Sequence, residues 1–376
     1  MRKVLIIHES LGGGGAERVL VEMLNEFDLS SYQIDLLVVY KSIKEQYLSN
    51  IPTKVNLSFI YQSPQRPRLA RLLSKIGLAE YIEKARINKI INKKCHYDSI
   101  ISFMEGSAMK FHSYLLDRSA NNISWVHIDL AKNHWSQIYF KSKMEEQRLY
   151  NMMSHIVFVS EVAQSSFNKL FAVNPSINQH VIYNIIDSER IKNHATKLDV
   201  VTNKFTLVSV GRLAKQKRYD RLIDAAKRLI DLGYDFEFWI IGSGVLDGAL
   251  KMQVHSLGLQ NNIIFKGFVD NPYPYIRAAD VFIMTSDFEG YPTVICESLV
   301  LGKVIITTEV AGAKELLGDS EYGIISDFSI ENLAGHVIEV YKNKDLHQKL
   351  SQKSEERSAI FEKESSMSKI YNLLLV

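Results

Sequence analysis

Apolar segments of strand length alternate with longer amphipathic segments along most of the chain, and this alternation constrains the fold more than any other feature. In the first half it predicts strands at 3–8, 34–39, 54–60, 99–103, 123–126, 156–159 and 180–183, with helices between them, for instance at 16–27 and 162–171. In the second half it predicts strands at 205–210, 236–241, 263–265, 281–284, 304–307 and 323–325, and helices at 219–232, 246–257, 293–301 and 330–341. Such alternation is typical of α/β proteins, in which helices cover a parallel sheet.

The two series are separated by a polar stretch, 184–203, which has no sustained apolar period and which we interpret as a linker. We therefore expect two doubly wound, Rossmann-like domains, one over residues 1–186 and one over 187–360. In open sheets of this kind ligands bind outside the carboxyl ends of the strands. Functional residues are therefore expected just after strands.

Composition excludes several classes of protein. The net charge of +3 is too small for a chain that coats nucleic acid through bulk charge, so no nucleic-acid partner is expected. Two cysteines, Cys95 and Cys296, cannot form a disulfide framework. The apolar run at 4–7 is too short for a signal peptide or a membrane-spanning helix. Together these features predict a cytoplasmic protein.

The positive charge is concentrated in segment 66–94, where nine Lys and Arg residues accompany two Glu residues. Apolar residues recur there at close to helical spacing. Such a segment can hold a protein on an anionic membrane surface, here the inner face of the plasma membrane. An ordinary pair of surface helices with a solvated basic face is the alternative.

Four glycines, 12–15, lie between the first predicted strand and the first predicted helix. Consecutive glycines let the backbone approach a ligand closely, and a helix N-terminus favours an anion. The dinucleotide-binding motif Gly-x-Gly-x-x-Gly is not matched, because Glu17 or Arg18 occupies the position of its third glycine. The P-loop motif is not matched either, since it requires Ser or Thr after Gly-Lys and Gly302-Lys303 is followed by Val304. A tight turn is the simpler alternative reading.

Two further motifs follow strands in the second half. Gly211 and Arg212 come directly after strand 205–210, and Lys217 follows five residues later. A guanidinium fork and a lysine ammonium both suit phosphate oxygens. After strand 281–284, Glu289 precedes Glu297 by eight residues, from a loop into a helix. Two carboxylates so placed can accept hydrogen bonds from hydroxyl groups of one elongated ligand.

His127 follows strand 123–126, where a lone histidine is often structural. The chain contains no histidine and cysteine cluster with metal-ligand spacing and no Asp-x-Asp loop for a divalent ion. We therefore expect neither a metal nor another cofactor.

In combination these motifs resemble family 4 of the retaining glycosyltransferases, in the right order over nearly the whole chain. Supporting matches are 181–184, 265–269 and 307–312. The resemblance implies the glycosyltransferase B fold, with a nucleotide sugar between the domains and a last helix, about 361–376, packed back on the N-terminal domain. The chain departs from the family pattern at Arg218, where glycine is common, at Ala311, and at 183–185.

The resemblance also implies roles. Arg212 and Lys217 neutralise the leaving diphosphate, Glu289 contacts the donor sugar with His127 beside it, and Glu297 holds the ribose hydroxyls. The further donor-binding residues expected are Gly13, Gly14, Gly15, Gly211, Phe268, Val269, Gly290, Tyr291, Pro292, Thr293 and Val294.

We accordingly expect a retaining, metal-independent glycosyltransferase that moves a hexose or N-acetylhexosamine from a nucleotide-diphosphate sugar, foremost a UDP-sugar. The expected acceptor is a saccharide, foremost a lipid-linked one or else an oligosaccharide, bound by the N-terminal domain, in surface polysaccharide biosynthesis such as capsule or O-antigen assembly. The alternative is a non-catalytic peripheral subunit of an assembly complex that binds nucleotide or recruits a partner. A nicotinamide-dependent dehydrogenase is disfavoured because the dinucleotide-binding motif is not matched.

Overall fold

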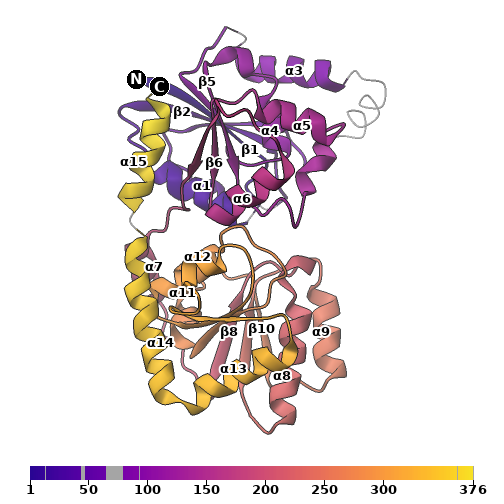
Figure 1. The fold of residues 1–376 in the computed structure, drawn as a ribbon, viewed down its shortest axis with the longest axis vertical. Coiled ribbons are helices and arrows are strands. Elements are labelled where there is room, and N and C mark those ends of the chain that lie inside the picture. Colours follow the sequence, from indigo (N-terminus) through magenta and orange to yellow (C-terminus); the bar gives the residue numbers. More distant parts are fainter. Residues whose placement is uncertain (13, 44–46, 65–78, 93, 362, 376) are drawn as a thin grey trace. The chain divides into compact units, whose positions relative to one another are not determined.

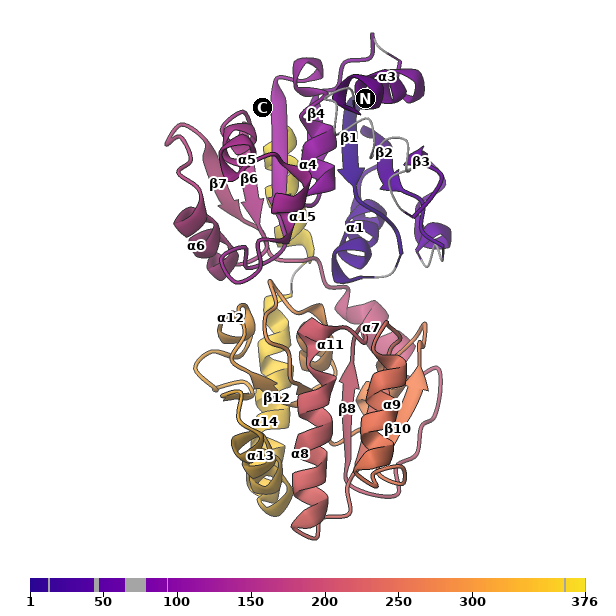
Figure 2. The ribbon, with the colours of Figure 1, turned by 90° about the vertical axis from the view of Figure 1, so that its right-hand side faces the viewer.

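The computed structural model describes residues 1–12, 14–43, 47–64, 79–92, 94–361 and 363–375. They form two compact units. Unit 1 comprises Met1–Ile185 with Lys363–Val376, and unit 2 comprises Ile186–Glu362. Each unit has its own parallel sheet with helices on both faces (Figures 1 and 2).

Within the described residues, the sheet of unit 1 has seven strands in the order β3-β2-β1-β4-β5-β6-β7. β1 lies between β2 and β4, so the sheet is wound in both directions from its first strand. The strands are β1 (Arg2–His8), β2 (Tyr32–Tyr40), β3 (Asn56–Tyr61), β4 (Ser99–Ser102), β5 (Asn121–Val126), β6 (His155–Phe158) and β7 (Asn178–Val181).

The helices of unit 1 include the last one of the chain, α15, which lies on the face of the sheet opposite α4 and α5 (Figures 1 and 2). On α15, the ring of Tyr371 stacks on Tyr32 with 5.3 Å between centroids. Asn121 Nδ2 donates to the Leu373 carbonyl at 2.7 Å. The helices and short 3-10 turns are α1 (Gly15–Glu26), η1 (Leu48–Asn50), α3 (Ala79–Ile90), α4 (Ser107–His112), η2 (Leu116–Arg118), η3 (Trp135–Tyr139), α5 (Lys143–Tyr150), α6 (Glu161–Leu170) and α15 (Lys363–Leu374).

In unit 2 the described sheet has six strands in the order β10-β9-β8-β11-β12-β13, again wound both ways from its first strand. The strands are β8 (Thr206–Val210), β9 (Glu237–Ile241), β10 (Ile263–Gly267), β11 (Val281–Met284), β12 (Val304–Thr308) and β13 (Ile324–Ser326). The helices and 3-10 turns are α7 (Ser188–Ala195), η4 (Lys215–Lys217), α8 (Tyr219–Asp231), α9 (Asp247–Ser256), α10 (Tyr273–Ala278), α11 (Thr293–Val300), α12 (Ala313–Leu317), α13 (Ile330–Lys342), α14 (Lys344–Arg357) and η5 (Ser358–Ile360).

The apolar runs explain these sheets. Residues 4–7 of β1 are fully buried, as expected for a parallel strand covered on both faces. In unit 2 one face of α8 packs on the sheet, and its Leu222 and Ile223 join Phe238 and Ile283 in one core cluster. The predicted fold class, two doubly wound α/β units, is confirmed.

The stretch that we interpreted as a linker, 184–203, is partly helical, so that interpretation is wrong for residues 188–195. Asp187 caps α7 by accepting a hydrogen bond from the Arg190 N–H at 2.9 Å. The helix packs on α10 and α11 and buries Ile191 and Ala195. A helix of two turns with two buried apolar positions has too little periodicity to stand out from a polar sequence.

Of the predicted membrane-docking segment 66–94, residues 66–78 and 93 lie outside the described residues. Residues 79–90 form α3, as part of unit 1. Among the described helices, none combines the length and the apolar character needed to cross a membrane.

Candidate active site

Two loops of unit 2 leave the same edge of the sheet because β8 and β11 are neighbouring parallel strands. The first loop, 211–218, follows β8, and the second, 285–292, follows β11. Gln216 joins them twice. Its carbonyl accepts from the Asp287 N–H at 2.9 Å, and its side-chain Nε2 donates to the Phe288 carbonyl at 2.7 Å.

Lys217 and Glu289, both predicted from the sequence, meet where these loops join. Lys217 Nζ lies 2.6 Å from Glu289 Oε1, and the two side chains are only 20% and 11% exposed. Gly211 lies behind the lysine, since a Cβ at residue 211 would come within 3.4 Å of Lys217 Cε. An ammonium group beside a carboxylate can bind an anion and an adjacent hydroxyl group of one ligand.

Arg212 lies in the first loop and is exposed. Within the part of the chain that the structure describes, its guanidinium forms no hydrogen bond or ion pair with another side chain. Its five N–H donors are therefore available to an anion at this edge of the sheet.

Glu297 lies on α11, which begins directly after the second loop, and the residue is 3% exposed. The start of α11 adds the partial positive charge of a helix N-terminus. Gly312, at φ +75°, packs against the loop, because a Cβ there would lie 2.7 Å from the Gly290 carbonyl oxygen. The predicted loop residues Gly290, Tyr291 and Pro292 are buried, and Thr293 and Val294 are half-buried.

Phe268 and Val269 follow β10, which is separated from β8 by β9. Phe268 is 48% exposed and Val269 is half-buried. Phe268 therefore has exposed surface at the same carboxyl edge as the two loops, and its contact with a nucleotide base stays a prediction.

A third loop beside these two, which contains Gly242 and Gly244, was not predicted from the sequence. A Cβ at Gly242 would lie 1.9 Å from the Gly211 carbonyl oxygen, and one at Gly244 would lie 2.4 Å from that of Leu213. This loop therefore supports the turn from which Arg212 projects. The signal that could have found it is a Gly-x-Gly directly after an apolar strand.

In unit 1, His127 follows β5, and its backbone N–H donates to Glu105 Oε2 at 3.0 Å. Its Nε2 is buried without a hydrogen-bond partner among the described residues. Burial, with a smaller contribution from His8, lowers the pKa of His127 to about 3. The imidazole is therefore neutral at physiological pH and can act as a hydrogen-bond partner but not as a cation.

The predicted glycine-rich loop is only partly described. Gly14 is the N-cap of α1, and Gly15 is the first residue of that helix. Gly13 lies outside the described residues. Helix α1 begins seven residues after the end of β1, and binding of an anion by the N–H groups of its first turn stays a prediction.

Two carboxylates of unit 1 were also missed. Glu105 is buried and accepts a second hydrogen bond, from Trp135 Nε1 at 3.0 Å, and burial raises its pKa to about 7. Glu9 accepts from Ser107 Oγ at 2.9 Å, and burial raises its pKa too. Both follow apolar strands, which is the signal that the sequence offered.

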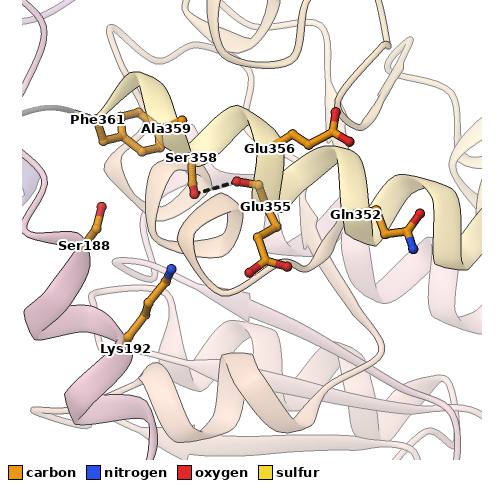
Figure 3. A pocket seen from close by; sticks show the side chains of 8 residues that line it. All are labelled: Ser188, Lys192, Gln352, Glu355, Glu356, Ser358, Ala359 and Phe361. Carbon is orange, nitrogen blue, oxygen red and sulfur yellow. Dashed lines mark hydrogen bonds between the residues drawn. The ribbon is translucent and has the colours of Figure 1, made fainter.

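A cavity of about 650 Å³ lies elsewhere in unit 2 and contains none of the predicted residues. Figure 3 shows Lys192 of α7 and Glu355 of α14 extending toward one another from opposite walls. It is lined by Ser188, Lys192, Gln352, Glu355, Glu356, Ser358, Ala359 and Phe361. The candidate residues of unit 2 therefore lie at the carboxyl edge of its sheet and do not line this cavity.

We predict that Glu105→Gln flattens the pH dependence of unfolding between about pH 4.5 and 7. In this range the folded protein retains a proton on Glu105 that the unfolded chain loses. The free energy of unfolding therefore falls by roughly 1–3 kcal/mol on account of Glu105 as the pH rises. Denaturant titrations of the wild type and the variant at several pH values measure how the free energy of unfolding changes with pH. A loss of stability from the missing hydrogen bond that is the same at every pH does not alter this slope. Parallel curves would contradict the prediction.

Comparison with known proteins identifies similar sequences and folds. Residues 190–357 match the model of the family described as "Glycosyl transferases group 1". Over 372 residues, 96% of each chain, the sequence is 28% identical to the Campylobacter jejuni enzyme N-acetylgalactosamine-N,N'-diacetylbacillosaminyl-diphospho-undecaprenol 4-alpha-N-acetylgalactosaminyltransferase. The fold is similar to that of Anabaena HepE in complex with UDP-glucose, with a TM-score of 0.77 and 20% identity over 100% of this chain and 99% of that one. A variant of S. aureus TarM in complex with UDP gives a TM-score of 0.78 and 13% identity over 100% of both chains. Residues 190–357 therefore match the group 1 glycosyltransferases, the chain is similar over nearly its whole length to an enzyme of that kind, and its fold is the glycosyltransferase B fold.

Proposed function

We propose that this protein transfers a hexose or N-acetylhexosamine from a UDP-sugar to a lipid-linked saccharide, with retention of configuration at the anomeric carbon. The pathway that we propose is surface polysaccharide assembly, such as that of a capsule or O-antigen. The observation that supports a transferase most directly is the Lys217–Glu289 ion pair at the joint of two loops, 2.6 Å long and largely covered from water.

The donor side of the reaction requires groups that stabilise a leaving diphosphate. As the bond between the anomeric carbon and the phosphate oxygen breaks, the electron pair stays with the diphosphate. The oxygen of the acceptor hydroxyl bonds to the carbon, and its proton passes to an oxygen of the leaving diphosphate. Lys217 and the exposed Arg212 supply positive charge for the diphosphate. Glu289 then accepts a hydrogen bond from a sugar hydroxyl, and Glu297 accepts from the ribose.

The choice of UDP and of a lipid-linked acceptor is supported by the relatives. Two proteins of similar fold, HepE and TarM, are known in complex with UDP or UDP-glucose. The C. jejuni relative acts on a diphospho-undecaprenol acceptor. We propose that unit 1 binds the acceptor and that the enzyme acts in the cytoplasm, on the inner face of the plasma membrane, with segment 66–94 as its predicted contact with anionic lipid.

Lys217→Ala should lower kcat by about 100-fold or more, because the lysine acts on charge that develops in the transition state. Glu297→Gln should instead raise the dissociation constant for UDP roughly tenfold, because a hydrogen bond to the ribose is present in the ground state too. Steady-state kinetics with UDP-sugars and calorimetric titration with UDP measure the two effects.

Lys215→Ala is the matched control, since Lys215 lies in the same 3-10 turn and is exposed. It should keep nearly full activity. Kinetics in which Glu297→Gln mainly lowers kcat and Lys217→Ala mainly weakens UDP binding would overturn the assigned roles. A wild-type protein that binds UDP but transfers no sugar would favour the non-catalytic subunit.

We also propose that no metal ion takes part, because the chain lacks an Asp-x-Asp loop and its own cations reach the candidate site. Dialysis against EDTA should therefore leave the transfer rate unchanged. Loss of activity that manganese or magnesium restores would refute this proposal.

A further inference from the structure

Arg218 has a backbone conformation that few side chains adopt. Its φ is +51° and its ψ is +45°, in the left-handed region, and among the described residues Ser320 is the other non-glycine with a positive φ. A residue with a Cβ is strained there, and glycine is not. A compensating contact of its side chain is therefore expected.

That contact is a bridge between two elements. The Arg218 Nε lies 3.0 Å from both carboxylate oxygens of Asp220, at the start of α8. Its Nη1 lies 3.1 and 3.2 Å from the two oxygens of Asp287, in the loop after β11. The guanidinium thus joins the loop that contains Lys217 to the loop that contains Glu289.

Asp287 is itself held from a second side. Arg221 Nη2 donates to Asp287 Oδ1 at 2.8 Å, and Arg221 Nη1 donates to the Thr285 carbonyl at 2.7 Å. The Thr285 hydroxyl donates back to the Arg218 carbonyl at 3.0 Å. The two loops are therefore connected next to the Lys217–Glu289 pair by contacts that do not include either member of that pair.

This second connection matters when the donor binds, and here the inference rests on the proposed function. A diphosphate that takes Lys217 as its partner replaces Glu289, so the bond between Lys217 and Glu289 no longer holds the loops together. We propose that Arg218 is a positioning residue, whose bridge to Asp287 keeps Lys217 and Glu289 correctly placed relative to one another when the donor is bound. Such pre-positioning supports the chemical step more than ground-state binding of the nucleotide.

The test is Arg218→Gly, which removes the bridge and also relieves the backbone strain, so that the variant is not expected to misfold. We expect kcat with a UDP-sugar to fall by roughly 10- to 100-fold. The dissociation constant for UDP, measured by calorimetry, should change less than about threefold, and the melting temperature should stay within a few degrees of the wild type. Loss of a residue with only a structural role would lower the melting temperature or weaken UDP binding along with kcat.

Asp220→Asn is the matched control, because it removes the local partner of Arg218 and leaves the bridge between the loops. It should retain kcat within about twofold, whereas Asp287→Asn should lose activity as Arg218→Gly does, and combining Arg218→Gly with Asp287→Asn should add little further loss. Unchanged kcat in Arg218→Gly, or equal losses in Asp220→Asn and Asp287→Asn, would overturn the inference while leaving the proposed function intact. A wild type that neither binds UDP nor transfers sugar would overturn both.

Discussion

The ion pair between Lys217 and Glu289 is the interaction on which the proposed chemistry depends. Its members are 72 residues apart in the chain and meet because β8 and β11 are adjacent parallel strands. Where water is largely excluded, each charge needs a partner, and an unpaired one is costly. The carboxylate therefore keeps the ammonium group in place until an anionic ligand competes for it. Arg218 and Asp287 hold the same loops without taking part in that exchange.

Much of the fold could be predicted because parallel strands are covered on both faces and so read as continuous apolar runs, as in residues 4–7 of β1. The order of the strands could not be predicted from periodicity, since it depends on which runs pair in space. Helix α7 and helix α14 were missed for another reason. Each buries only two residues, Ile191 and Ala195 in one and Leu350 and Ser354 in the other, so neither shows a strong helical period.

Some features of the candidate site could likewise be predicted from the sequence, and others could not. Lys217 and Glu289 could be singled out because they follow strands, but their contact depends on the strand order. Arg218 was visible as an unusual residue, although its bridge depends on a left-handed backbone that no periodicity reveals. Glu105 was missed because its partner Trp135 lies 30 residues later, in the 3-10 turn η3, and their hydrogen bond is not visible in the sequence. These residues show that sequence patterns locate reactive side chains better than they reveal the groups that position them.

A crystal structure of the protein with an unreactive UDP-sugar analogue would test the roles of Lys217 and Glu289 directly. We predict that Lys217 Nζ leaves Glu289 Oε1 and lies about 3 Å from an oxygen of the diphosphate, with Glu289 on a sugar hydroxyl and Glu297 on the ribose. The bridge between Arg218 and Asp287 should be unchanged. A diphosphate bound elsewhere, with the bond between Lys217 and Glu289 intact, would contradict these roles.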